Sequence, residues 1–154
     1  MGGRFFEEWK EGEEFLTPSR TVTETDLVMF AAMSGDYNEL HTSEEFMKES
    51  RFGRRIGHGL LGLALSHGLM FRTGITENSV IALISVDSWK FLAPFYIGDT
   101  IHVKLTVVET RPSRSKPDLG FVKLSFELVN QKGEVIQSGV KTFGFKRRAG
   151  GASY

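Results

Sequence analysis

An acid and an imidazole stand five positions apart in the segment Met33–His41, whose sequence is MSGDYNELH. The acid is Asp36 and the imidazole is His41. A carboxylate and a histidine on one short segment can hold a water molecule between them and move its protons. The alternative is structural, because an aspartate that follows one helix and a histidine that precedes the next can also serve as helix caps.

Length and composition narrow the class of protein. The 154 residues, 40% apolar and 25% charged, are typical of a single globular domain over residues 1–154. The 19 basic and 19 acidic residues cancel, so charge gives no reason to expect a nucleic acid or an acidic membrane as partner. The absence of cysteine excludes disulfides and thiolate chemistry. The sequence shows no signal peptide and no apolar run long enough to span a membrane, which predicts a cytoplasmic protein.

Helices are expected on both sides of the acid–imidazole pair. A capping box at Thr23–Asp26 predicts a helix that ends at Gly35, so Asp36 begins the following loop. A second capping box at Thr42–Glu45 predicts a short helix and places His41 just before it. A longer helix is expected over 59–72, and it is apolar on nearly all sides, which is typical of a buried helix.

The second half of the chain changes to the alternating pattern of strands. Alternation of apolar and polar residues predicts strands with one buried face, whereas a continuous apolar run at 80–86 predicts a strand covered on both faces. With a first strand at 14–22, this order predicts an α+β fold in which an antiparallel sheet of about four long strands wraps around the buried helix. The long strands are expected near residues 80–86, 100–108, 121–129 and 135–145.

The pattern around the pair resembles the MaoC-like dehydratases, the hot-dog-fold family that includes (R)-specific enoyl-CoA hydratases. The resemblance covers about residues 10–146. Two positions depart from the family pattern: Glu39 replaces a proline that often follows the asparagine, and His67 replaces a small hydroxyl residue. The residues that carry the resemblance are Ser34–His41, Phe52, Ile56, His58–Leu61 and Phe91–Thr100.

The resemblance implies a hot-dog domain that forms a homodimer or an assembly of dimers, with an acyl-CoA thioester bound near the subunit interface. The implied reaction is reversible addition of water to a trans-2-enoyl-CoA to give a (3R)-3-hydroxyacyl-CoA, which makes the chain a hydro-lyase. Carried over by position, the catalytic acid falls on Asp36, the histidine on His41, and the backbone donor to the thioester oxygen on Gly59. Coenzyme A enters only as part of the substrate.

The residue types suit this reaction. Adding water to an enoyl thioester requires a base that takes a proton from water at C3 and an acid that protonates C2. The N–H groups at a helix N-terminus lack partners within the helix, so Gly59 can stabilise negative charge on the thioester oxygen. Neither a metal nor an organic cofactor is required.

Other polar residues are candidates for substrate binding. Asn38 is expected to brace the loop between the pair, and His58 to steady the turn into the long helix. Ser66 and His67 lie one position apart, where a hydroxyl group or an imidazole could line the substrate pocket. For His67 the alternative is a buried structural histidine.

Two basic segments allow either phosphate binding or simple solvation. The loop at 111–118 joins two predicted strands and could contact the phosphates of coenzyme A, because arginine and lysine favour phosphate oxygens. The same choice applies to the loop at 51–57. The cations concerned are Arg111, Arg114 and Lys116 in the first loop, and Arg51, Arg54 and Arg55 in the second.

Two other functions are compatible with this sequence. An acyl-CoA thioesterase could use the same fold, although it would not require the Asp36–His41 pair. A non-catalytic acyl-CoA-binding subunit is the other alternative, and retention of both residues argues against it. The sequence leaves open the length of the acyl chain, its branching, and a distal carboxylate on it.

Overall fold

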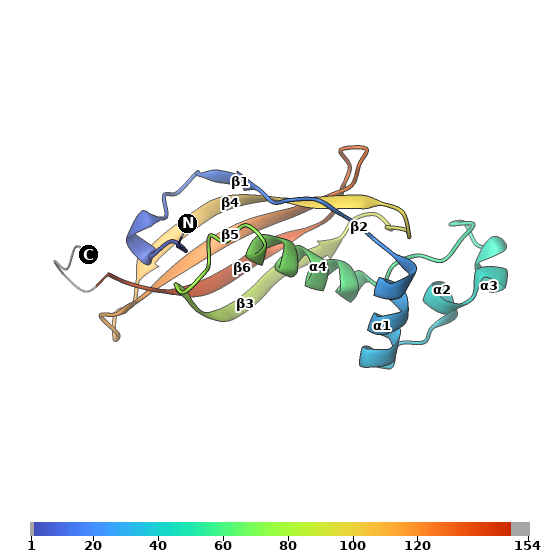
Figure 1. Cartoon of the computed structure of the whole chain (residues 1–154), viewed down its shortest axis with the longest axis horizontal. Coiled ribbons are helices and arrows are strands. Elements are labelled where there is room, and N and C mark those ends of the chain that lie inside the picture. The colour runs from blue at the N-terminus through green and yellow to red at the C-terminus, as the bar shows by residue number, and fades with distance from the viewer. Residues whose placement is uncertain (1, 149–154) are drawn as a thin grey trace.

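The computed structural model describes residues 2–148 as a curved antiparallel sheet with one long helix lying on one of its faces (Figure 1). The predicted domain limits extend further, since Met1 and residues 149–154 lie outside the described part. The helices are η1 (Phe6–Glu8), α1 (Glu24–Ser34), α2 (Glu39–Thr42), α3 (Glu44–Lys48) and α4 (Gly59–Phe71). The strands are β1 (Glu14–Leu16), β2 (Arg20–Thr21), β3 (Val80–Phe91), β4 (Thr100–Pro112), β5 (Leu119–Val129) and β6 (Val135–Lys146).

The predicted alternation in the long strands produces one buried face. Leu105 of β4 lies opposite Phe126 of β5, and both are fully buried on the side of the sheet that faces α4. The strand order is β1-β4-β5-β6-β3, and β2 pairs separately with β4. The α+β prediction of an antiparallel sheet curved over a helix is therefore confirmed. Within residues 2–148, no helix combines the length and the apolar character needed to cross a membrane.

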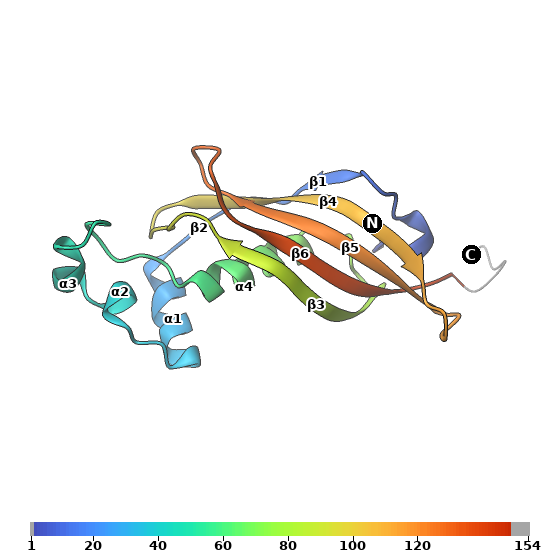
Figure 2. The same ribbon diagram turned by 180° about the vertical axis from the view of Figure 1, so that it is seen from behind.

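Burial of α4 is less complete than its composition predicts. The helix buries Leu61, Leu69 and Met70 against the sheet. On the side away from the sheet, Leu60 is 62% exposed and Phe71 is 39% exposed. Seen from behind, the other face of the sheet carries no helix (Figure 2). A single sheet covers only one side of α4, which explains the exposed leucine and phenylalanine.

The strand predictions at 14–22 and 80–86 need correction. Pro18 lies in a break that divides the first expected strand into β1 and β2. The strand expected at 80–86 extends further, to Phe91, as β3, and its register shifts at irregularities between Val80 and Lys90. This strand lies at the edge of the sheet, beside β6. It is exposed at most positions, rather than covered on both faces.

The helix ends that surround the acid–imidazole pair follow the predicted caps in part. The capping box of Thr23 and Asp26 is formed, and Gly35 ends α1 with a left-handed φ of 78°. The second cap is Ser43, whose hydroxyl accepts a hydrogen bond from the N–H of Phe46. This cap lies one residue later than expected. A separate short helix, α2, starts at the Asn38 cap, so His41 is inside a helix rather than in front of one.

Two glycines on α4 allow a matched test of how the helix packs. A methyl group at Gly62 would lie 2.2 Å from the side-chain nitrogen of Gln137, whereas at Gly68 it would meet nothing within 4 Å. We expect Gly62→Ala to lower the free energy of unfolding by about 1–3 kcal/mol through overpacking. We expect Gly68→Ala to raise it by about 0.5–1 kcal/mol, because alanine favours the helix. Urea denaturation of both variants tests this, and equal effects would contradict the packing described.

Candidate active site

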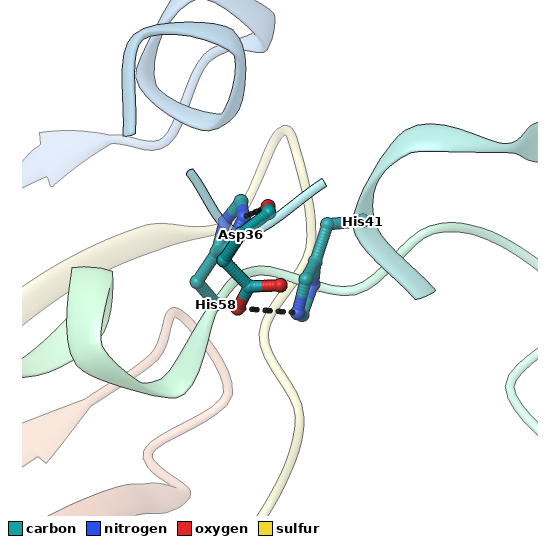
Figure 3. Close-up of side chains that lie close together, drawn as sticks. All are labelled: Asp36, His41 and His58. Atoms are coloured by element: carbon teal, nitrogen blue, oxygen red, sulfur yellow. Dashed lines mark hydrogen bonds and ion pairs between the residues drawn. The ribbon is translucent and has the colours of Figure 1, made fainter. Parts of the chain in front are cut away.

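The loop after α1 brings the carboxylate of Asp36 to the imidazole of His41, as Figure 3 shows. The distance from Asp36 Oδ2 to His41 Nε2 is 3.8 Å. The His41 side chain is 10% exposed and the Asp36 side chain is 50% exposed. Asn38 fixes the turn between them, since its Oδ1 accepts a hydrogen bond of 3.0 Å from the N–H of Leu40 and caps α2. The sequence-predicted pair is thus held together by local structure, and Asn38 braces its loop.

A backbone carbonyl determines which nitrogen of His41 carries the proton. His41 Nδ1 lies 2.8 Å from the carbonyl oxygen of Ile56, which can only accept a hydrogen bond. Nδ1 therefore carries hydrogen, and in the neutral imidazole Nε2 is an acceptor. This acceptor is the atom that faces Asp36. The segment before α4 is held in turn, because the N–H of Ile56 donates to the carbonyl of Leu40 at 3.0 Å.

The space between the pair suits a water molecule. A separation of 3.8 Å is too long for a direct hydrogen bond, but a third atom can lie at hydrogen-bonding distance from both groups. An ionised Asp36 and a neutral His41 both present acceptors there, so one water can donate to each of them. Its lone pairs then remain free to attack an electrophilic carbon.

His58 forms the wall behind the pair. Its ring stacks on the His41 ring, with 3.8 Å between centroids and 26° between planes. Its Nε2 donates a 3.0 Å hydrogen bond to the backbone carbonyl of Asp36. Burial lowers the pKa of His58, and the adjacent His41 lowers it further. The residue is 2% exposed, so a neutral His58 orients both members of the pair, as expected of a structural residue at this turn.

A pocket of about 330 Å³ extends from His41 to the start of α4. His41 and Gly59 both line it, together with an apolar wall from the segment after β3. A Cβ at Gly59 would lie 2.9 Å from the Phe91 ring, so only glycine leaves this approach open. The N–H groups of the first turn of α4 have no acceptor within the helix. The wall residues are Phe91, Leu92, Ala93, Pro94 and Phe95.

Gln137 is a pocket residue that motif reasoning did not identify. Its Nε2 donates to the carbonyl of Gly59 at 3.0 Å, and its Oε1 accepts from Trp89 Nε1 at 3.1 Å. The side chain is buried, and it fixes the first turn of α4 against the sheet. Alternation along β6 is the signal that could have revealed it, because Gln137 has the same parity as the inward-facing Phe143 and Phe145.

The predicted residues Ser66 and His67 do not line this pocket. The Ser66 hydroxyl donates to the carbonyl of Leu63 at 2.6 Å and accepts from Lys141 Nζ at 3.1 Å. The His67 ring packs beside Phe143, with centroids 5.8 Å apart. Burial, and secondarily the charge of Lys141, lower the pKa of His67. Both residues therefore belong to the contact of α4 with the sheet.

Lys141 beneath α4 is a buried cation that the motifs did not reveal. Its side chain is fully buried, and its ammonium lies 4.8 Å from the Trp89 ring and 4.2 Å from the Phe126 ring. Across residues 2–148, no carboxylate lies within 4 Å of it. Burial lowers the pKa of Lys141 to about 7.

The end of β4, which carries Arg111, and the loop after it, which carries Arg114 and Lys116, lie at the opposite end of the sheet from α1, α2 and α3 (Figure 1). Arg111 stacks over Phe121 at 4.5 Å and lies 3.9 Å from a carboxylate oxygen of Glu109. The fold of this chain thus does not bring the three predicted cations to the pocket.

The geometry of the site does not suit a metal ion. Asp36, His41 and His58 bring possible ligand atoms within 4.8 Å of one another. The two imidazole planes are nearly parallel, so their in-plane lone pairs do not converge on one point as tetrahedral coordination requires. The arrangement favours a water between carboxylate and imidazole over a metal ion.

Comparison with known proteins identifies relatives of the chain. The model of the MaoC-like domain family matches residues 7–127. The chain is 40% identical over 103 residues to protein MaoC of Klebsiella aerogenes, covering 67% of this chain but only 30% of that protein's length. It is 32% identical over 110 residues to the (R)-specific enoyl-CoA hydratase of Rhodospirillum rubrum, covering 71% of this chain and 74% of the relative.

Solved structures agree on the fold. The X-ray structure of a monoamine oxidase regulatory protein from Archaeoglobus fulgius superposes with a TM-score of 0.88 at 33% identity, covering 97% of this chain and 98% of that one. A Mycobacterium tuberculosis protein with a double hot-dog fold superposes with a TM-score of 0.83 at 17% identity, covering 99% of this chain and 47% of that one. The sheet and helix described above therefore form a hot-dog fold.

Proposed function

We propose, because this chain belongs to the MaoC-like dehydratase family, that it is a hydro-lyase that adds water to a trans-2-enoyl-CoA or catalyses the reverse dehydration. The product of hydration is a (3R)-3-hydroxyacyl-CoA. The observation that carries the proposal is the 3.8 Å gap between Asp36 Oδ2 and His41 Nε2, in which both atoms are acceptors for one water. The similarity to the Rhodospirillum hydratase supports it.

In the proposed mechanism the pair handles every proton. The water donates its protons toward Asp36 and His41, and its oxygen forms a bond to C3 as one proton leaves it. The C2–C3 double bond shifts its electrons toward the thioester oxygen, and the N–H of Gly59 stabilises the charge that develops there. The pair then returns a proton to C2, so no net proton is gained or lost by the protein.

Two assays on one sample distinguish a hydratase from a thioesterase and from a non-catalytic acyl-CoA-binding subunit. With crotonyl-CoA we expect loss of the enoyl absorbance without release of free coenzyme A. Release of a free thiol, detected with a thiol reagent, would instead support a thioesterase. Binding of acyl-CoA without any turnover would support the non-catalytic subunit. Absence of hydration across short and medium enoyl-CoAs would reject the proposal.

We also propose that the protein forms a homodimer through β3. This strand is twelve residues long, lies at the edge of the sheet and has no strand on its outer side within the described residues. An uncovered edge of this length invites pairing with another strand. Light scattering after gel filtration should give twice the mass of one chain, and a monomeric mass would contradict this. The exposed apolar residues on β3 are Ile81, Leu83, Ile84, Val86 and Phe91.

A further inference from the structure

We propose that Arg51 and Arg54 form an anion subsite at the mouth of the pocket, which binds the phosphate groups of the carrier to which the acyl group is attached. The inference rests on the proposed function, because it assigns the part of the thioester that lies outside the pocket. Both residues lie between α3 and α4, at the end of the molecule that carries the acid–imidazole pair (Figure 1).

The neighbouring Arg55 shows which cation of this loop has a structural role. Its Nη1 and Nη2 lie 2.8 Å and 2.6 Å from the two carboxylate oxygens of Glu24, and its Nε donates to Glu44. The loop is thereby tied to α1 and α3, and the charge of Arg55 is neutralised. One cation thus fixes the loop that presents the other two.

Arg51 and Arg54 have no such partners. Within residues 2–148, neither guanidinium has a carboxylate within 4 Å, including that of the nearby Glu49. Each lies over an aromatic ring instead, Arg51 at 5.0 Å from Phe52 and Arg54 at 4.1 Å from Tyr96. Stacking orients a guanidinium while leaving its N–H donors free. Both arginines are exposed, so their donors can reach a ligand without loss of an existing ion pair.

The position of the two arginines indicates which class of ligand they can bind. Arg51 lines the same pocket as His41 and Gly59, whose remaining wall is mainly apolar. Arg54 stacks on Tyr96, which follows that wall directly. A thioester held at His41 would place its acyl group among apolar side chains and its carrier arm toward this mouth. Planar guanidinium groups with free N–H donors match phosphate oxygens well, so a phosphorylated carrier is the ligand class that fits.

The test compares thioesters that differ only in their phosphates. Wild type and Arg51→Gln/Arg54→Gln would be assayed with crotonyl-CoA, with crotonyl-phosphopantetheine and with crotonyl-pantetheine. We expect the double variant to raise KM for crotonyl-CoA about 10- to 100-fold, with kcat nearly unchanged. KM for crotonyl-pantetheine, which has no phosphate, should not change. Lys10→Gln, which replaces an exposed lysine between η1 and β1, is the matched control and should leave all constants unchanged.

The phosphopantetheine thioester shows which phosphate of the carrier the two arginines bind. An effect on this ester equal to that on crotonyl-CoA would place the subsite on the phosphate that coenzyme A shares with acyl carrier proteins. A smaller effect would place it on the adenosine phosphates. An equal change in KM for all three thioesters, or no change in KM for any of them, would contradict the proposed subsite.

A binding measurement makes the result independent of turnover. Calorimetric titration of coenzyme A itself should show weaker binding by the double variant than by wild type, even if no thioester is hydrated. Loss of hydration with retained, arginine-dependent binding would reject the proposed reaction and keep the subsite. Equal binding of coenzyme A by both proteins would reject the subsite alone.

Discussion

Replacing Asp36 with asparagine should lower kcat for crotonyl-CoA hydration by about 100- to 10,000-fold, because an amide cannot take a proton from the bound water. The fold should be retained, since this side chain is half exposed. The Asp36 Oδ1 also accepts a 3.3 Å hydrogen bond from the N–H of Asn38, and an amide oxygen can keep this contact. Steady-state kinetics and circular dichroism together test the expectation.

His41→Gln should cause a loss of similar size, since it removes the acceptor Nε2 that faces the water. The Asp36→Asn/His41→Gln double variant should be hardly slower than the worse single variant, because residues that act on one water are not additive. His102→Gln is the matched control, as His102 lies on β4 among residues paired with β5 and outside the pocket. Retention of more than a tenth of the wild-type rate by either single variant would exclude that residue from proton transfer.

Lys141→Met should stabilise the protein at pH 6 by a few kcal/mol, because it removes a buried cation without a carboxylate partner. The pKa of Lys141 is about 7 in the folded protein, compared with 10.5 for an unperturbed lysine. Below pH 7 both the folded and the unfolded chain carry the charge, so the folded state bears the full cost of its burial. That cost is on the order of 5 kcal/mol for a difference of this size.

The sign of the pH dependence follows from proton binding. Between pH 7 and 10.5 the unfolded chain holds the Lys141 proton and the folded chain releases it, so the stability of the wild type rises with pH. The advantage of Lys141→Met should therefore be largest at pH 6 and shrink as pH increases to 10. Chemical denaturation at several pH values measures both trends.

Lys123→Met provides the control on the neighbouring strand β5. Lys123 is 38% exposed and forms a 2.9 Å ion pair with Glu109, so its replacement should change stability by about 1 kcal/mol or less. An advantage of Lys141→Met that is independent of pH would show that burial of its charge is not the cause. A variant less stable than wild type at pH 6 would show that the Ser66 contact outweighs the cost of burial.

Interactions within a few residues could be predicted from the sequence. The cap at Thr23, the left-handed glycine at Gly35 and the Asp36–His41 spacing depend on neighbours along the chain, and all three appear as expected in the structure. The prediction that Thr42 caps the second helix is wrong by one residue. Thr42 and the adjacent Ser43 can both act as an N-cap, and Ser43 is the one that caps α3. Alternation predicted the buried faces of β4 and β5, since it reports only which side of a strand is apolar.

Contacts between distant segments were decided by the tertiary structure. Composition could not show that β3 lies beside β6 at the edge of the sheet. An apolar run has the same sequence pattern in a central strand and in an edge strand. Nor could composition show that the carbonyl of Ile56 orients His41, or that Arg55 is neutralised by carboxylates while Arg51 remains free. The sequence by itself thus determined the two groups that can hold a water. The fold decided which ring stacks on His41, which of its nitrogens carries hydrogen, and the pocket that His41 shares with Gly59, because these depend on residues brought together only by packing.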